Sequence, residues 1–153
     1  MKFLITLTAV SMATNCVFAL TLDDPPGKRQ TDPLTEQCRN MLELQLVVYK
    51  KTRHLNNVIE KRTDKKLDEL DKKNLFALSK KQKMIRNHVT KTIAMLKAEG
   101  NAVAFREVFE LLSADMKLVE NRLRKGDAGP TTQAMENDII LTLEEIIGSI
   151  KTR

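Results

Sequence analysis

Apolar residues recur at intervals of three and four along most of this 153-residue chain, which is typical of amphipathic helices. The cleanest series consists of Ala102, Phe105, Phe109, Leu112, Met116, Val119 and Leu123. Comparable series occupy residues 34–59, 75–98 and 131–151. At a rise of about 1.5 Å per residue, each segment is roughly 30–40 Å long. Matching lengths let four helices bury their stripes along one another, so we predict an all-α protein, an antiparallel four-helix bundle with a long or extended first helix.

Some positions in these stripes hold polar residues instead of apolar ones. Gln45 and Thr52 fill gaps in the first stripe, and Gln82 and Thr92 belong to the second. Between 41 and 49, additional apolar residues widen the first stripe. A stripe this wide is expected to be covered on more than one side and to form the centre of the core.

The segments are separated by residues that interrupt helices. We read residues 20–32 as a disordered lead-in and 33–153 as the helical domain, which begins with Asp32 as N-cap before Pro33. Gly100 and Gly126 are natural helix stops. Residues 60–74 contain only Leu67 and Leu70 as apolar residues, so this charged connector can be either a helical extension or a solvated link. A continuous helix through it would join the first two segments into a rod of about 100 Å, and the alternative fold is an elongated coiled-coil hairpin.

The first nineteen residues have the pattern of a secretory signal peptide. Lys2 precedes an apolar run, and Val17-Phe18-Ala19 offers small residues at the cleavage site, so we expect cleavage after Ala19. The remaining chain would then be exported to the periplasm or the extracellular space. The apolar run is too short for a membrane anchor. Lipidation of Cys16 is a further alternative, although Asn15 fits such a signal poorly.

The residues that most often carry chemistry do not form a recognisable catalytic set. Cys38 is the only cysteine after cleavage, and we expect either a buried apolar role or an intermolecular disulfide that would make a homodimer. His54 and His88 lack the spacing of helical metal sites. Glu144 and Glu145 are adjacent, so they point about 100° apart on a helix. We therefore expect no enzyme activity and no cofactor, and a metal enzyme or hydrolase is the least favoured class.

Charge is distributed unevenly. Residues 50–99 contain fifteen Lys and Arg against six Asp and Glu, a net charge of +9, whereas residues 127–153 have two bases and five acids, a net charge of −3. The residues expected to bind a polyanion or partner are Lys61, Arg62, Lys65, Lys66, Lys72, Lys73, Lys80, Lys81, Lys83 and Arg86. Such a basic face suits an acidic protein, an envelope polysaccharide or an anionic lipid surface, although it can also be an ordinary solvated helix face. Specific nucleic-acid binding is not expected, because no reader motif is present and few aromatic residues are available for stacking.

The stretch that leads into the last helix resembles a motif of exported proteins of planctomycete bacteria. In that motif T-G-x-x-T-Q-x-x-Q precedes an I-x-x-x-L-x-x-[LI]-I helix. Here the corresponding residues are 127–136, DAGPTTQAME, followed by Ile139, Leu143, Ile146 and Ile147. Ala128 replaces the usual Thr and Glu136 the usual Gln. The resemblance implies a family and a compartment, but no activity.

A second resemblance involves "PLTEQCRNM" at 33–41 and "LSKKQKMIRN" at 78–87. These stretches are similar to the L-T-x-x-Q repeats of periplasmic helical chaperones of the Spy/CpxP type. Leu78, Ser79 and Gln82 fit the repeat, whereas Cys38 occupies the Gln position of the first copy. The leading expectation is a non-enzymatic, exported interaction protein of the cell envelope that binds an acidic partner. The resemblance implies the alternative, an ATP-independent, chaperone-like holdase.

Overall fold

Four helices build the part of the chain that the computed structural model describes, residues 32–99 and 103–151. They are α1 (Pro33–Glu60), α2 (Glu69–Glu99), α3 (Val103–Arg124) and α4 (Pro130–Lys151). The predicted signal peptide, Cys16, the lead-in up to residue 31 and the turn at Gly100 lie outside the described residues. None of the described helices combines the length and the hydropathy that a membrane crossing requires.

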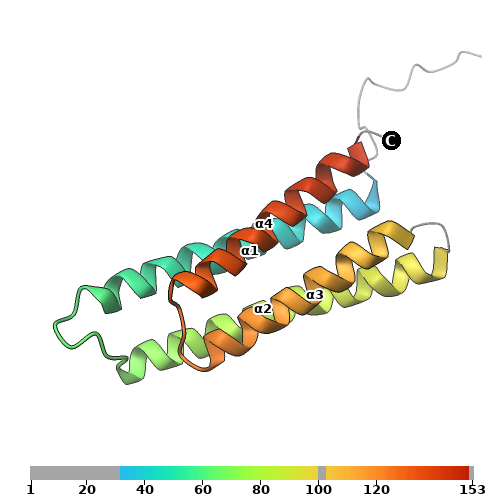
Figure 1. Cartoon of the computed structure of the whole chain (residues 1–153). Coiled ribbons are helices and arrows are strands. Elements are labelled where there is room, and N and C mark those ends of the chain that lie inside the picture. Colours follow the sequence, from blue (N-terminus) through green and yellow to red (C-terminus); the bar gives the residue numbers. More distant parts are fainter. Residues whose placement is uncertain (1–31, 100–102, 152–153) are drawn as a thin grey trace, which may run out of the picture.

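The helices run antiparallel to their neighbours and form a square bundle (Figure 1). Within the described residues, α1 contacts α2 and α4, and α3 contacts the same two helices, whereas the diagonal pairs do not meet. The predicted all-α four-helix bundle is therefore confirmed. One consequence of the square arrangement is that the α1–α2 face and the α3–α4 face lie on opposite sides of the molecule.

The core is formed by the stripes that the sequence predicts. In α3, Phe109, Met116, Val119 and Leu123 are fully buried, and in α4 Leu143 is fully buried against them. The polar residues of the stripes are buried as well, because Gln45, Thr52 and Gln82 have no exposed surface. These buried polar groups must find hydrogen-bond partners inside the bundle.

The broad apolar stretch of the first helix is only partly covered. α1 does pack against both α2 and α4, and Met41 and Val48 belong to the core. Leu44 and Val47, however, remain 45% and 42% exposed. The expectation that this whole stretch lies at the centre of the core is wrong for these two residues, because they lie on the outer edge of the α1–α2 seam.

The chain leaves the helical conformation between Glu60 and Glu69, so α1 and α2 do not form one rod. The second helix begins six residues before the predicted start at Leu75. Its start is set by a reciprocal cap, in which the Asp71 N–H donates to Asp68 Oδ1 (2.7 Å) and the Asp68 N–H donates to Asp71 Oδ2 (3.0 Å).

Arg62 fastens the end of α1 to this cap. Its guanidinium pairs with the buried Asp71 carboxylate and lies 3.2 Å from Asp68 Oδ2. The hydrogen bond from Arg62 holds the pKa of Asp71 below its usual range. The connector is therefore a folded link with its own ion pairs.

A second tight turn joins α3 to α4. Gly126 has a φ of +87°, the Gly126 N–H donates to Leu123 O, and the Asp127 N–H donates to Arg122 O, as in a Schellman motif. Asp127 Oδ1 then accepts the N–H of Gly129, the residue before α4. The stretch that carries the planctomycete-like motif is thus the turn that stops one helix and starts the next.

Candidate functional site

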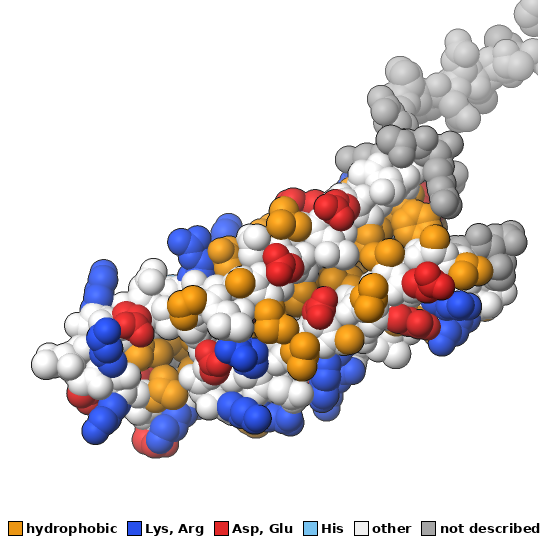
Figure 2. Space-filling model, in the orientation of Figure 1, with side chains coloured by type: hydrophobic (Ala, Val, Ile, Leu, Met, Phe, Trp, Pro, Cys, Tyr) orange, Lys and Arg blue, Asp and Glu red, His pale blue; other side chains and the backbone are white. Residues whose placement is uncertain are grey.

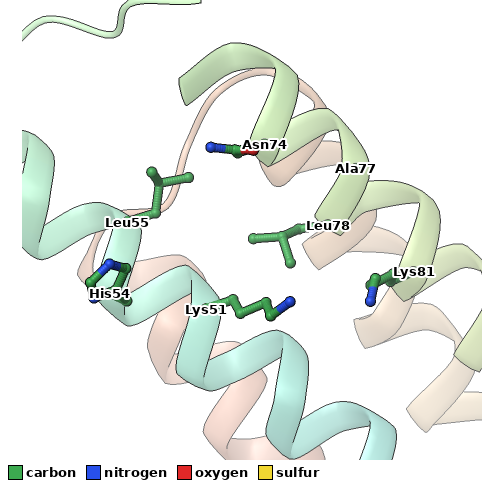
Figure 3. A pocket seen from close by; sticks show the side chains of 7 residues that line it. All are labelled: Lys51, His54, Leu55, Asn74, Ala77, Leu78 and Lys81. Atoms are coloured by element: carbon green, nitrogen blue, oxygen red, sulfur yellow. The ribbon is translucent and has the colours of Figure 1, made fainter. Parts of the chain in front are cut away.

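A row of hollows follows the seam between α1 and α2. One of them, about 310 Å³, is lined by Lys51, His54, Leu55, Asn74, Ala77, Leu78 and Lys81 (Figure 3). The next, about 140 Å³, is lined by Leu44, Val47, Val48, Lys81, Met84 and Ile85. A third, about 160 Å³, is lined by Gln37, Asn40, Met41, Leu44, His88 and Lys91. Lys81 is shared by the first two and Leu44 by the last two, so the hollows adjoin one another along the seam, and we call this row of hollows the α1–α2 groove.

The rims of this groove arise from helical periodicity. On α1 they consist of Gln37, Asn40, Leu44, Val47, Lys51 and His54, and on α2 of Asn74, Ala77, Lys81, Met84, His88 and Lys91. Both sets follow intervals of three and four, so each forms a stripe along one side of its helix. Each rim residue comes one position before a core-stripe residue of the same helix. The rim span on α1, from residue 37 to residue 54, is about 26 Å long.

The groove combines an apolar floor with basic rims. Val48, Leu55 and Ile85 reach its floor from the core. Lys51, Lys81 and Lys91 are exposed, and none of the lining residues is acidic. In Figure 3 the Lys51 side chain extends from α1 toward α2 and passes below Leu78 in the view. Because no lining carboxylate neutralises the lysines, the groove is positively charged and partly apolar.

Two side-chain amides hold the two helices together beneath the groove. Gln45 Nε2 donates to Gln82 Oε1 (3.1 Å), and Gln82 Nε2 donates to Gln45 Oε1 (2.9 Å). Further along the seam, the Thr92 hydroxyl donates to Gln37 Oε1 (3.0 Å). These directional bonds fix the spacing of α1 and α2 without filling the space between the rims. Gln82, which fits the chaperone-like repeat, therefore has a structural partner in the core.

The ten basic residues predicted from the sequence lie in two parts of the chain. Lys61, Arg62, Lys65 and Lys66 lie in the connector, and the other six lie on α2. Several are already in ion pairs: Arg62 with Asp68 and Asp71, Lys65 with Glu60, Lys72 with Glu69, and Arg86 with the buried Glu120. Lys80 lies 4.6 Å from the centre of the Phe76 ring.

Only Lys81 of the ten lines the groove. The other groove lysines, Lys51 and Lys91, belong to the basic segment 50–99 but are not among the ten predicted residues. Both lysines could have been identified from the sequence, because each comes one position before a residue of the core stripe of its helix.

Cys38 and the two histidines lie in different surroundings. Cys38 is fully buried, and burial raises the pKa of its thiol to about 11, with Asp32 adding to the effect. A disulfide to another chain would require α1 to move away from the core. His54 and His88 are exposed on the groove rims. Within the described residues, no three His, Cys, Asp or Glu side chains gather closely enough to hold a metal ion.

One buried carboxyl was not anticipated as a special residue. Glu136 has no exposed surface, its Oε1 accepts a hydrogen bond from Thr52 Oγ1 (2.9 Å), and its Oε2 has no partner in the described residues. Desolvation raises its pKa from 4.5 to about 7, although the Thr52 hydrogen bond acts in the opposite direction. It lies inside the bundle between α1 and α4, away from the groove.

No protein-family model matches the chain, and comparisons with curated proteins and with solved structures found no match. The groove must therefore be interpreted from its own chemistry.

Proposed function

We propose that the protein is a non-enzymatic, exported interaction protein of the cell envelope that holds an acidic partner in the α1–α2 groove. The observation that carries the proposal is the composition of the groove, in which three exposed lysines border an apolar floor and no carboxylate lines the walls. An acidic partner with apolar side chains would satisfy both features at once. A purely hydrophilic polyanion would engage only the rims.

The lysines of the groove are available for such a partner. Within the described part of the chain, Lys51, Lys81 and Lys91 make no ion pair, unlike Arg62 and Arg86. Binding to them therefore breaks no existing pair. Because the rim lysines are exposed, their attraction for a partner is screened by salt, with a Debye length of about 10 Å at 0.1 M.

The experiment compares two variants that lose the same charge. The groove variant is Lys51→Gln/Lys81→Gln/Lys91→Gln, and the control variant is Lys61→Gln/Lys73→Gln/Lys83→Gln, whose lysines are exposed outside the groove. Retention on heparin and binding of poly-L-glutamate are measured at low and moderate salt. We expect the groove variant to lose most of the binding and the control to keep most of it.

Equal losses in the two variants would show that only overall charge matters and would reject the groove as the binding site. Binding that does not change with salt would reject an electrostatic interaction. Circular dichroism of both variants checks that the helices are intact.

A second candidate, an ATP-independent holdase, is favoured by the apolar side chains on the rims. Leu44, Val47 and Met84 are 45%, 42% and 61% exposed, and a client segment with apolar residues could cover them. This candidate predicts suppression of the aggregation of a reduced, unfolding client that persists at moderate salt and weakens in Leu44→Ser/Met84→Gln. No suppression at stoichiometric amounts would rule it out.

A further inference from the structure

The α3–α4 face, opposite the groove, also carries exposed apolar residues. Val108, Leu111 and Leu118 of α3 are 36%, 69% and 51% exposed, and Leu141 of α4 is 47% exposed. Figure 2 shows apolar side chains spread over this face, with both acidic and basic side chains among them. Four large apolar residues of α3 and α4 thus remain in contact with water.

Three carboxylates of α3 and α4 are opposite in charge to the groove lysines. Asp115 of α3 and Asp138 and Glu145 of α4 are exposed, and within the described residues none of them is in an ion pair. Asp115 precedes Arg122 by seven residues and thus lies on the same side of α3, and Arg122 donates to Thr132 of α4 (2.9 Å). Asp115 therefore borders α4. The α3–α4 face pairs unneutralised acids with exposed apolar side chains.

The two faces are complementary in both respects. The groove offers Lys51, Lys81 and Lys91 beside exposed Leu44 and Met84. The opposite face offers Asp115, Asp138 and Glu145 beside Val108, Leu111, Leu118 and Leu141. The three groove lysines and these three carboxylates are opposite in charge, and both faces leave apolar side chains in water.

From this complementarity we propose that the occupant of the α1–α2 groove is a second copy of the chain, which docks its α3–α4 face there. The inference rests on the proposed function, because it names the acidic partner of the same groove. Docking pairs the lysines of one copy with the carboxylates of the next and removes the apolar residues of both from water.

The geometry determines the kind of assembly. The contact uses two different surfaces, so it is heterologous, and a pair of docked copies keeps one unused surface of each type. Because the two surfaces lie on opposite sides of a square bundle, added copies continue in the same direction and do not close into a twofold dimer. The assembly is therefore an open stack that grows with concentration and dissociates with salt.

The test uses the full-length chain, the groove variant and a second variant of the opposite face, Asp115→Asn/Asp138→Asn/Glu145→Gln. Size-exclusion chromatography with light scattering and sedimentation velocity measure the mass over a wide concentration range at low and moderate salt. We expect the native chain and the Lys61→Gln/Lys73→Gln/Lys83→Gln control to form a growing series of oligomers. Each face variant alone should remain monomeric.

Mixing the two face variants gives the sharpest outcome. The groove variant keeps its acidic face and the other variant keeps its groove, so an equimolar mixture should form one-to-one dimers and nothing larger. A native chain that stays monomeric at every concentration, or a mixture without dimers, overturns the inference. Growth that persists in the groove variant overturns it as well.

These outcomes separate the inference from the proposed function. If the native chain is monomeric while the groove variant still loses poly-L-glutamate binding, the groove binds an acidic partner that is not a second copy. If poly-L-glutamate binding is the same in native and groove variant, the proposed function fails irrespective of the oligomeric state.

Discussion

Glu136 should make the stability of the bundle depend on pH. Its side chain has no exposed surface, and the single hydroxyl of Thr52 is its only partner in the described residues. The same hydroxyl lies 3.1 Å from Val48 O. A protonated Glu136 can donate to Thr52 while Thr52 donates to Val48 O, so the neutral acid satisfies more polar atoms than the carboxylate does.

The direction of the effect follows from the two pKa values. The folded-state pKa of Glu136, about 7, lies above the ordinary value of 4.5. Between these values the folded state binds more protons than the unfolded state, so the free energy of unfolding falls as the pH rises through this window and then levels off. At about 1.4 kcal/mol for each pKa unit, the total loss is about 3 kcal/mol.

Glu136→Gln removes the titrating group, and urea unfolding in buffers below, within and above the window measures the result. We expect the pH dependence in this window to shrink by about 3 kcal/mol relative to the native chain. The absolute stability is a poorer measure, because the new amide leaves donors unpaired, which costs about 1–3 kcal/mol. Glu144→Gln, at an exposed position of the same helix, is the matched control. Parallel pH profiles for the native chain and Glu136→Gln would refute the argument.

Two further predictions concern the hydrogen bonds and turns that position the helices. Gln45→Leu alone should lower the free energy of unfolding by about 1–3 kcal/mol because it leaves the Gln82 amide buried and unpaired, whereas the double change to Leu should be nearly neutral. A double-mutant cycle by urea unfolding checks this, and additive effects would contradict it. Gly126→Ala should cost about 1–2 kcal/mol because the residue has a φ of +87°, and its added Cβ would lie 2.7 Å from Leu67 Cδ1. Gly148→Ala is the control, since its Cβ would meet nothing within 4 Å, and it should stabilise the helix by about 1 kcal/mol.

The fold could be predicted because the helix stripes are nearly uninterrupted. In α3 every position from Phe109 to Leu123 that the spacing assigns to the core is buried. The glycine at 126 ends this helix as expected. The start of α2 was missed because hydrophobic periodicity is absent there, and a polar cap between Asp68 and Asp71 sets it instead. The spacing of Asp68 and Asp71, three residues apart, could have predicted this cap.

The candidate site was harder to predict because a segment rich in basic residues does not necessarily form a basic surface in the folded protein. Lys72 and Arg86 belong to the basic segment, but the fold pairs them with Glu69 and Glu120. Lys51 and Lys91 lie on different helices, and only the pairing of α1 with α2 brings them to one groove. Which helices are neighbours depends on the whole arrangement, and periodicity within one helix does not contain that information.

The structure separates the residues that stabilise the bundle from those that would bind a partner. Gln45 and Gln82 hold α1 and α2 together from the core, whereas the rim lysines make no ion pair within the described residues. Substitution of a rim lysine therefore removes no interaction on which folding depends, and exposed positions of this kind usually change stability by less than about 0.5 kcal/mol. The core residues and the rims can thus vary independently. A binding surface could be lost or reversed in charge while the four-helix bundle persists. The nature of the partner must therefore be inferred from the rim residues, because the four-helix bundle itself does not indicate it.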